Sequence, residues 1–331
     1  MVNAKSVSVI IPNYNGRQLL EIYLPFTFAA LGNIPVDFEV IIVDDCSKDD
    51  SISFIRNEYP QVRLLTNERN RGFSYSCNRG LEIAENELIF LLNSDVKLLP
   101  DYFAPLWKYF DDPRTFGVTG RIIDMEGWHV QEAARVPGFN GFKIKTAYFY
   151  YIQGEDNHTF TFYLSGANAL IDAGKLKKMG GFDEFFSPFY GEDLDMGIRA
   201  WRAGWQCYYE HEAICRHQGS ASTNNLNTPK WVKAIYYRNR FFVHAIHLNG
   251  IKLLLWFLQI TVIDLLPKLL IGQWWTWKSY CGLIQNFKGI KMSRLKIKQL
   301  MVNNGSSISV DDVVKFIGDS VNVNTVIKFK A

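Results

Sequence analysis

The stretch "ELIFLLNSDVKLLPDYF", residues 87–103, decides the fold because an apolar run ends abruptly in polar side chains. Residues 88–92 carry no charge and lead directly into Asn93, Ser94 and Asp95. Such a run is typical of a strand that is buried on both faces. The sequence therefore predicts a buried strand whose end places the Asp95 carboxylate at the rim of a sheet.

Composition limits the classes of protein that fit. The chain has 331 residues, 48% of them hydrophobic, so its length favours one large domain with an appendage. A formal charge of +3 is too small to indicate nucleic-acid binding. Five cysteines without a CxxC pair favour free thiols in a reducing compartment over disulfides or zinc. The N-terminal residues 1–16 lack a signal-peptide pattern, so we expect a cytoplasmic protein.

Apolar runs alternate with helical patterns through the N-terminal third of the chain. Strands are expected at 7–12, 38–45, 62–66 and 87–93, and helices at 17–31, 49–59 and 73–85. Strands alternating with helices imply right-handed crossovers and a mostly parallel sheet. In such sheets, ligands bind beyond the carboxyl ends of the strands.

Three polar clusters follow these strands: "IPNYNG" (11–16), "DDCS" (44–47) and "NSD" (93–95). Turn formation alone explains any one of them equally well, but it explains three in register less well. No GxGxxG or GxxxxGK[ST] motif is present, which removes the main support for a dinucleotide dehydrogenase or a P-loop enzyme. A divalent cation on Asp95 would instead neutralise a bound diphosphate.

Five segments carry a resemblance to a known family. They are "VSVIIPNYNG" (7–16), "VIIVDDCSKDDS" (40–51), "NERNRGFSYSCNRGLEIAENELIFLLNSDV" (67–96), "LSGANALIDAGKLKKMGGFDE" (164–184) and "YGEDLDMGIRAWRAGW" (190–205). In this order they resemble family 2 glycosyltransferases over roughly residues 6 to 220. The resemblance implies a GT-A type α/β fold, Rossmann-like, with a mostly parallel central sheet flanked by helices and a C-terminal helical extension.

The same resemblance divides the chain. It implies a catalytic domain over 1–225, with a nucleotide-sugar half at about 1–124 and an acceptor half at about 125–225. The remainder, 226–331, is expected to form the helical extension.

The resemblance also assigns candidate residues for the donor. The nucleotide-binding candidates are Pro12, Tyr14, Asn15, Asp45, Arg71, Asn78 and Ser94. The candidate metal ligands are Asp95 and His217, and the expected cofactor is Mn²⁺ or Mg²⁺. Asn93 stands where the strict family motif has its first aspartate, and a neutral amide would bind the metal more weakly. Outside the resemblance, a lone histidine such as His217 is more often a packing or surface residue.

The segment from residue 190 carries the catalytic candidates. Leu194, Ile198 and Trp201 recur at helical spacing, which places Glu192 and Asp193 at the start of a helix. The helix dipole favours acidic residues there whether or not they act in catalysis.

The resemblance gives these acidic residues their roles. It implies that Asp193 is the general base of an inverting transfer, with Glu192 as the other member of the catalytic pair. Glu192 and Asp195 are the next candidates for the base. Gly166 and Asp195 are expected on the acceptor side.

The function implied is transfer of a single sugar from a nucleotide-diphosphate sugar to a glycan or lipid-linked acceptor. A QxxRW motif, which marks processive synthases, is missing, and this favours single addition. The alternative is a catalytically silent relative that binds glycan or nucleotide as an assembly partner. Asn93 slightly favours that alternative, whereas the "ED" pair, Asp45 and His217 oppose it. The sugar, the acceptor, the linkage and the oligomeric state stay open.

Two regions allow more than one interpretation. Residues 125–160 are rich in aromatics and fit a variable acceptor loop or a packed aromatic cluster equally well. The apolar stretch 253–263 is shorter than the ~20 residues of a bilayer span. Basic flanks and nearby tryptophans favour helices at the inner face of the membrane, and packing on the catalytic domain or another subunit fits nearly as well. The end of the chain, 291–331, is expected to be a polar helical tail. The apolar stretch 253–263 is ended by Asp264, Pro267 and Lys268, and the nearby tryptophans are Trp274, Trp275 and Trp277.

Overall fold

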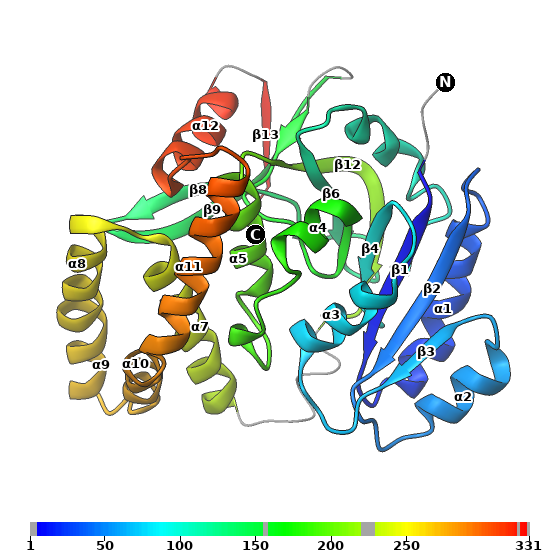
Figure 1. Cartoon of the computed structure of the whole chain (residues 1–331), viewed down its shortest axis with the longest axis horizontal. Coiled ribbons are helices and arrows are strands. Elements are labelled where there is room, and N and C mark those ends of the chain that lie inside the picture. Colours follow the sequence, from blue (N-terminus) through cyan, green and yellow to red (C-terminus); the bar gives the residue numbers. More distant parts are fainter. Residues whose placement is uncertain (1–4, 155–157, 220–228, 323–324, 330–331) are drawn as a thin grey trace.

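A computed structural model describes residues 5–154, 158–219, 229–322 and 325–329. Its main feature is a central sheet (Figure 1). The strands of this sheet are β1 (Val7–Asn13), β2 (Phe38–Asp44), β3 (Arg63–Thr66), β4 (Leu88–Leu92), β5 (Val96–Leu98), β6 (Thr115–Ile123), β7 (Val130–Glu132), β10 (Thr159–Phe160), β11 (Asn168–Asp172) and β12 (Gln206–His217). Within the described ranges their order is β10-β12-β6-β11-β4-β1-β2-β3, with β5 on β12 and β7 on β6.

The N-terminal half of this sheet is parallel, as the alternation of strands and helices predicts. β1 pairs in parallel with β2 and β4, and β2 pairs in parallel with β3. The crossovers are α1 (Arg17–Leu31), α2 (Ser51–Glu58) and α3 (Phe73–Ile83). The next strand along, β11, is antiparallel to β4 and β6, and β12 returns parallel to β6. The predicted α/β fold with its C-terminal helices is therefore confirmed.

The sheet is buried on both faces because successive side chains of a strand point to opposite sides. Ile10 of β1 belongs to the core beneath α3, and its neighbour Ile11 belongs to the core beneath α1. A Cβ atom on Gly80 of α3 would lie 2.6 Å from Ile10 Cγ2, so glycine lets this helix approach the sheet closely. This tight packing fixes the strand ends at which the polar clusters stand.

The remaining helices described in the first 205 residues include the one that carries the acidic segment. They are η1 (Ala104–Asp111), α4 (Ala173–Met179), η2 (Glu184–Phe186) and α5 (Glu192–Arg202). The apolar residues that predict α5 do face inward, since Leu194, Ile198 and Trp201 are each at most 4% exposed. The first turn of α5 therefore carries Glu192 and Asp193, as predicted.

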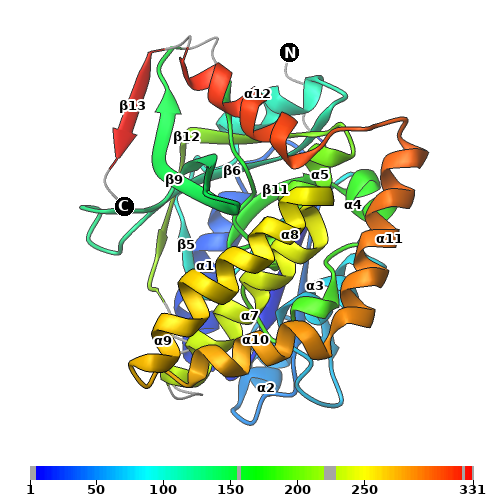
Figure 2. The same cartoon turned by 90° about the vertical axis from the view of Figure 1, so that its left-hand side faces the viewer.

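The C-terminal helices pack on the catalytic region. They are α7 (Pro229–His247), α8 (Gly250–Gln259), η3 (Ile260–Leu265, a π-helix), α9 (Leu266–Leu270), α10 (Trp275–Gln285), α11 (Phe287–Asn303) and α12 (Val310–Asn322). Phe242 of α7 and Ile297 of α11 share one hydrophobic core with Ile198 of α5. Figures 1 and 2 show these helices stacked against one end of the sheet. The predicted division between residues 225 and 226 falls in 220–228, outside the described residues.

A second, three-stranded sheet bears on residues 125–160 and corrects the expectation for the tail. Residues 134–152 form a hairpin of β8 (Ala134–Asn140) and β9 (Lys143–Ile152) where an acceptor loop was one of the two predictions. The packed aromatic alternative fits better, because Phe149 and Tyr150 are buried in a small core of their own. The tail also does more than continue as a helix, since β13 (Val326–Phe329) pairs with β9.

The helices α8, η3 and α9 run on from one another over Gly250–Leu270. Of the described helices, this 21-residue unit is the one that by length and composition could cross a membrane, and an 18-residue window within it has a mean hydropathy of 1.8. The expectation that the apolar stretch is too short is therefore wrong. The expectation was misled by Asp264, which interrupts the apolar pattern of the sequence. In the structure the charge of Asp264 is neutralised by Lys143, whose Nζ lies 2.8 Å away.

Candidate active site

The strand ends open into a cleft of about 620 Å³. Phe73 of α3, the segment 188–190 and the start of α5 line it together with the strand ends, and Trp231 of α7 closes its edge. Nine of the residues predicted from the sequence line this cleft: Pro12, Tyr14, Asp45, Ser94, Asp95, Gly166, Glu192, Asp193 and His217. The remaining predicted residues, Asn15, Arg71, Asn78 and Asp195, are not among the residues that line it.

Asn15 shapes a turn beside the cleft. Its side-chain Oδ1 accepts a hydrogen bond from Lys48 N at 2.7 Å, and its own N–H donates to Ser47 Oγ at 2.8 Å. Sequence reasoning missed Asn13, which stands just before this turn. Asn13 is 1% exposed, and its Nδ2 donates a hydrogen bond to Asp44 Oδ2 at 2.8 Å. Asn13 lines the cleft, and its buried Oδ1 has no hydrogen-bond partner within the described residues.

Asp45 orders the loop that follows β3. Its carboxylate accepts hydrogen bonds from Arg71 N at 2.8 Å and Gly72 N at 2.7 Å, and from Asn67 Nδ2 at 2.8 Å. Arg71 contributes its backbone to this arrangement, while its guanidinium lies 4.2 Å from the centre of the Tyr75 ring. Two of the nucleotide-binding candidates, Asp45 and Arg71, are thus joined directly by a hydrogen bond.

Asn78 has a different position from the one predicted. Its side chain lies between α3 and the segment before η2, where Nδ2 donates to Phe182 O at 3.0 Å and Oδ1 accepts from Phe182 N at 2.8 Å. These two bonds use the amide to join distant segments. Asn78 therefore supports the wall of the cleft without lining it.

Asp95 and His217 meet because β5 pairs with the end of β12, where His217 stands opposite Val96. His217 Nε2 lies 3.3 Å from Asp95 Oδ1, and His217 Nδ1 lies 3.0 Å from Gln131 Oε1. Within the described residues, no group of three or more His, Cys, Asp or Glu side chains is placed to hold a metal. A carboxylate and an imidazole on one wall nevertheless fit a cation that takes its other ligands from phosphate and water.

Glu192 and Asp193 stand at the other side of the cleft, at the N-terminus of α5. Burial and, to a smaller extent, the charge of the neighbouring Asp193 together raise the pKa of Glu192 to about 8. Burial also raises the pKa of the half-buried Asp193, while the Leu194 N–H and the positive charge of Arg240 oppose this rise. A carboxylate with a raised pKa is a stronger base, which is what proton abstraction from a hydroxyl requires.

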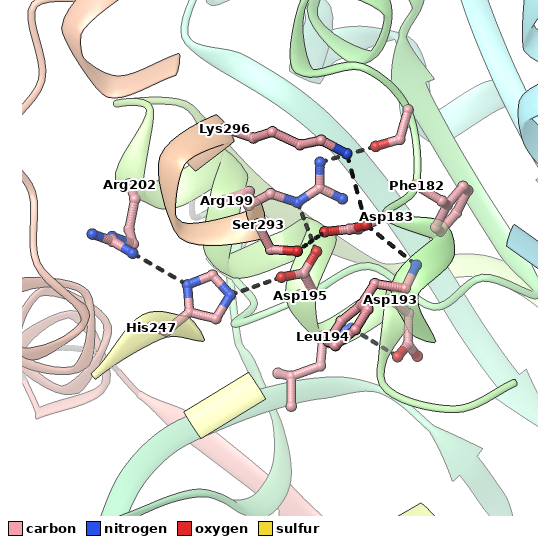
Figure 3. A network of polar contacts seen from close by, with 12 residues as sticks. Phe182, Asp183, Asp193, Leu194, Asp195, Arg199, Arg202, His247, Ser293 and Lys296 are labelled. Atoms are coloured by element: carbon pink, nitrogen blue, oxygen red, sulfur yellow. Dashed lines mark hydrogen bonds and ion pairs between the residues drawn. The ribbon is translucent and has the colours of Figure 1, made fainter. Parts of the chain in front are cut away.

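The acceptor-side prediction for Asp195 is wrong. Asp195 is fully buried, and its carboxylate accepts from Arg199 Nε at 2.7 Å and lies 2.9 Å from His247 Nε2. Figure 3 shows it pointing toward these two side chains, whereas Asp193 points away from them. Asp195 therefore ties α5 to α7 and does not face a substrate.

Sequence reasoning also missed an aromatic edge of the cleft. Phe189, Tyr190 and Trp231 line it, and the Phe189 and Trp231 ring centres are 5.7 Å apart. Their contact joins residues far apart in the chain, and a single aromatic residue in a sequence is more often part of a core. The consecutive aromatics at 189 and 190 were the only sequence signal.

The charge of Arg240 predicts a measurable pH effect. Asp193 must be deprotonated to act as a base, so the rate should fall as pH drops through its raised pKa. Arg240→Gln removes a cation that favours the carboxylate, so the pKa rises and the acidic limb of kcat/KM moves to higher pH. Lys278→Gln, on the exposed surface of α10, is the control and should leave the limb in place. A limb that stays fixed in Arg240→Gln would contradict this assignment.

Comparison with known proteins agrees with the fold. Solved structures with the same GT-A architecture include the mannosyltransferase PcManGT from Pyrobaculum calidifontis in complex with GDP-Man and Mn²⁺. It has a TM-score of 0.55 and 16% identity, over 96% of this chain and 86% of that one. S. aureus TarS 1–349 in complex with UDP-GlcNAc has a TM-score of 0.54 and 15% identity, over 96% of this chain and 92% of that one.

The family model for glycosyl transferase family 2 matches residues 8–180, and the chain belongs to this family. A validoxylamine A glucosyltransferase of Streptomyces hygroscopicus subsp. limoneus is 25% identical over 69% of this chain and 56% of its own length. An undecaprenyl-phosphate 4-deoxy-4-formamido-L-arabinose transferase of Pseudomonas syringae pv. syringae is 34% identical over 31% of this chain and 32% of its own length. The matched part thus spans about a third to just over half of these relatives.

Proposed function

We propose that this protein transfers one sugar from a nucleotide-diphosphate sugar to a hydroxyl group of a glycan or lipid-linked acceptor, with inversion at the anomeric carbon. The observation that carries the proposal is one cleft with two chemically different walls. Asp95 and His217 stand at the strand ends, and Asp193 stands at the start of α5. This arrangement suits a diphosphate on one wall and an acceptor hydroxyl at the other.

The chemistry follows from these positions. Asp193 takes the proton of the acceptor hydroxyl while the oxygen of that hydroxyl forms a bond to the anomeric carbon. The bond from that carbon to the diphosphate oxygen breaks, and its electron pair stays on the diphosphate. Asp95 and His217 would hold Mn²⁺ or Mg²⁺, which when bound supplies positive charge that stabilises the leaving group. Asn13 and Asp45 position the nucleoside from the ends of β1 and β2.

Calorimetry with UDP, GDP and TDP tests the donor site. We expect one nucleotide to bind more tightly with Mn²⁺ or Mg²⁺ than in EDTA. Asp95→Ala should weaken that binding by about 10- to 100-fold, because loss of a ligand costs at least as much as loss of an outer partner. The control is Asp112→Ala, whose partner is the surface residue Arg114. Equal affinity in EDTA for every nucleotide would contradict a diphosphate bound through a cation.

We further propose that the protein works at a membrane surface, on its cytoplasmic side. The support is one exposed apolar face along α8, η3 and α9. Figure 2 shows that these helices lie on the outside of the helical region. The opposite face of the same helices packs on the protein through Trp256 and Ile260, each 1% exposed. A helix held on one side by protein suits an interfacial position better than a span. The exposed face consists of Ile251, Leu254, Leu258, Val262, Ile263, Leu266, Leu270 and Ile271.

Sedimentation with anionic vesicles tests the membrane proposal. The full-length protein should pellet with phosphatidylglycerol vesicles, and Leu258→Glu combined with Leu270→Glu should keep it in the supernatant. Ile22→Glu, on the distant helix α1, places one such charge at another exposed apolar residue and should leave sedimentation unchanged. If the wild-type protein stays in the supernatant at low salt, the exposed face has another partner.

A further inference from the structure

A second cavity of about 290 Å³ lies in a part of the chain that the donor site does not use. It is lined by the first residues of β9, by α7 and by the helices from α8 to α10. The helix α7 borders both spaces, because Trp231 near its start lines the cleft and His244 near its end lines the cavity. Thirteen residues of helix separate these two positions by about 20 Å.

The cavity is positively charged. Lys143, Lys145, Arg240 and Lys268 line it, against the single carboxylate of Asp264. Asp264 is already paired with Lys143 Nζ at 2.8 Å. Among the described residues, the other three cations have no carboxylate within ion-pair distance. The cavity is therefore suited to an anion.

Two buried polar atoms on its wall have no hydrogen-bond partner: His244 Nε2 and Trp256 Nε1. The residues are 4% and 1% exposed, and their rings stack with centres 5.3 Å apart. His244 Nδ1 donates to Arg240 O at 2.6 Å, and burial lowers the pKa of His244 to about 3. The neutral ring thus presents Nε2 as an acceptor, beside the Trp256 N–H donor. Hydroxyl groups, which both donate and accept, satisfy such a pair.

A row of aromatic rings connects the two spaces along α7. Tyr190 at the cleft lies 5.8 Å from Tyr236, Tyr236 lies 5.5 Å from Tyr237, and Tyr237 lies 4.9 Å from Trp275, all between ring centres. Lys268 Nζ is 4.7 Å from the Tyr237 ring centre, so the row ends at a cation of the cavity. Tyr236 is 43% exposed, so its ring is accessible to a ligand. Exposed aromatic faces are suited to stacking against the apolar faces of sugars.

We propose that the cavity and this aromatic row are an extended acceptor site, which takes a saccharide that bears a phosphate or carboxylate group. The anionic sugar occupies the cavity, its hydroxyl groups reach His244 and Trp256, and the following sugars lie along the row toward Asp193. Arg240 stands between the two ends, because it lines the cavity and its charge also acts on Asp193. This inference rests on the proposed function, whose acceptor it specifies as an anionic saccharide.

The test uses the full-length protein labelled with ¹⁵N, in which the Trp256 indole signal is assigned from Trp256→Phe. Glucose 6-phosphate should shift that signal, and it should bind more tightly than either glucose or inorganic phosphate alone. Lys145→Gln and Lys268→Gln should each weaken its binding about tenfold, because each removes a charged partner. Lys278→Gln, on the same helical region but outside the cavity, is the matched control and should bind like the wild type.

The remaining outcomes overturn the proposal. Absence of any shift with glucose 6-phosphate would mean that the cavity holds only water. A shift produced by phosphatidylglycerol vesicles alone would assign the cavity to a lipid headgroup. Equal binding by Lys145→Gln, Lys268→Gln and the wild type would place the ligand elsewhere. Nucleotide binding measured on the same samples reports the donor site separately. If the protein bound glucose 6-phosphate in the cavity but bound no nucleotide, the proposed function would fail and the cavity would not.

Discussion

Replacement of Asp193 by asparagine is expected to lower the rate of sugar transfer by about two to four orders of magnitude, the usual scale for a lost general base. The amide keeps the size of the side chain and its place at the start of α5 but cannot accept the acceptor's proton. Nucleotide affinity should stay nearly unchanged, because the donor wall is formed by other residues. Transfer kinetics and calorimetry on the same preparation separate the two effects.

Glu192→Gln is the informative comparison for this variant. Glu192 is adjacent in sequence and lines the same cleft, but its pKa of about 8 leaves it largely protonated at neutral pH. A group that is already protonated is a poor base, so this change should cost less than Asp193→Asn. Full activity in Asp193→Asn would mean that the base is another residue, and Glu192 would then be the first to examine.

Asp195→Ala is expected to destabilise the protein by about 3–5 kcal/mol, the usual cost of removing one partner of a buried ion pair. Arg199 and His247 would lose their shared partner in a site where both are buried. Denaturant unfolding followed by circular dichroism measures the difference. Glu21→Ala is the control, because its ion pair with Arg17 is on the surface and contributes about 0.5 kcal/mol at most. A loss as small as that of the control would contradict the structural role.

The same network has a pH dependence. Arg199 and His247 outweigh the effect of burial and hold the pKa of Asp195 below the ordinary aspartate range. The stability that this carboxylate contributes is therefore fully present above the unfolded pKa and is lost as pH falls through the lower, folded value. Acid unfolding of Asp195→Ala should consequently depend less on pH than that of the wild type.

The parallel half of the fold could be predicted from local sequence alone. Buried strands and amphipathic helices leave a signal within ten or fifteen residues, and β1, α1, β2 and β4 fall within two residues of their expected ends. The sheet of β8, β9 and β13 left no comparable signal. Its last strand pairs residues 326–329 with residues 149–152, and a pairing over that separation has no local pattern.

The residues of the candidate site that follow strands could be predicted from the sequence. On a helix, the position of a residue around the helix axis decides whether its side chain faces the cleft or the core, and this could not be predicted. Asp193 and Asp195 are two residues apart, which rotates their side chains by about 200° around a helix. One therefore lines the cleft while the other enters the core. His247, which completes the buried network, lies 52 residues further along the chain than Asp195 and could not be linked to it from sequence. The aromatic row of α7 was missed for the same reason.

The central claim is that this cleft activates a nucleotide-diphosphate sugar. The most direct test incubates the purified full-length protein with UDP-, GDP- and TDP-sugars, with and without Mn²⁺ or Mg²⁺, and measures release of the nucleoside diphosphate. Release from one donor class is expected only with the cation, and it should be lost in Asp95→Ala and strongly reduced in Asp193→Asn. Tight nucleotide binding without release from any donor would contradict the claim and identify a silent, nucleotide-binding member of the family.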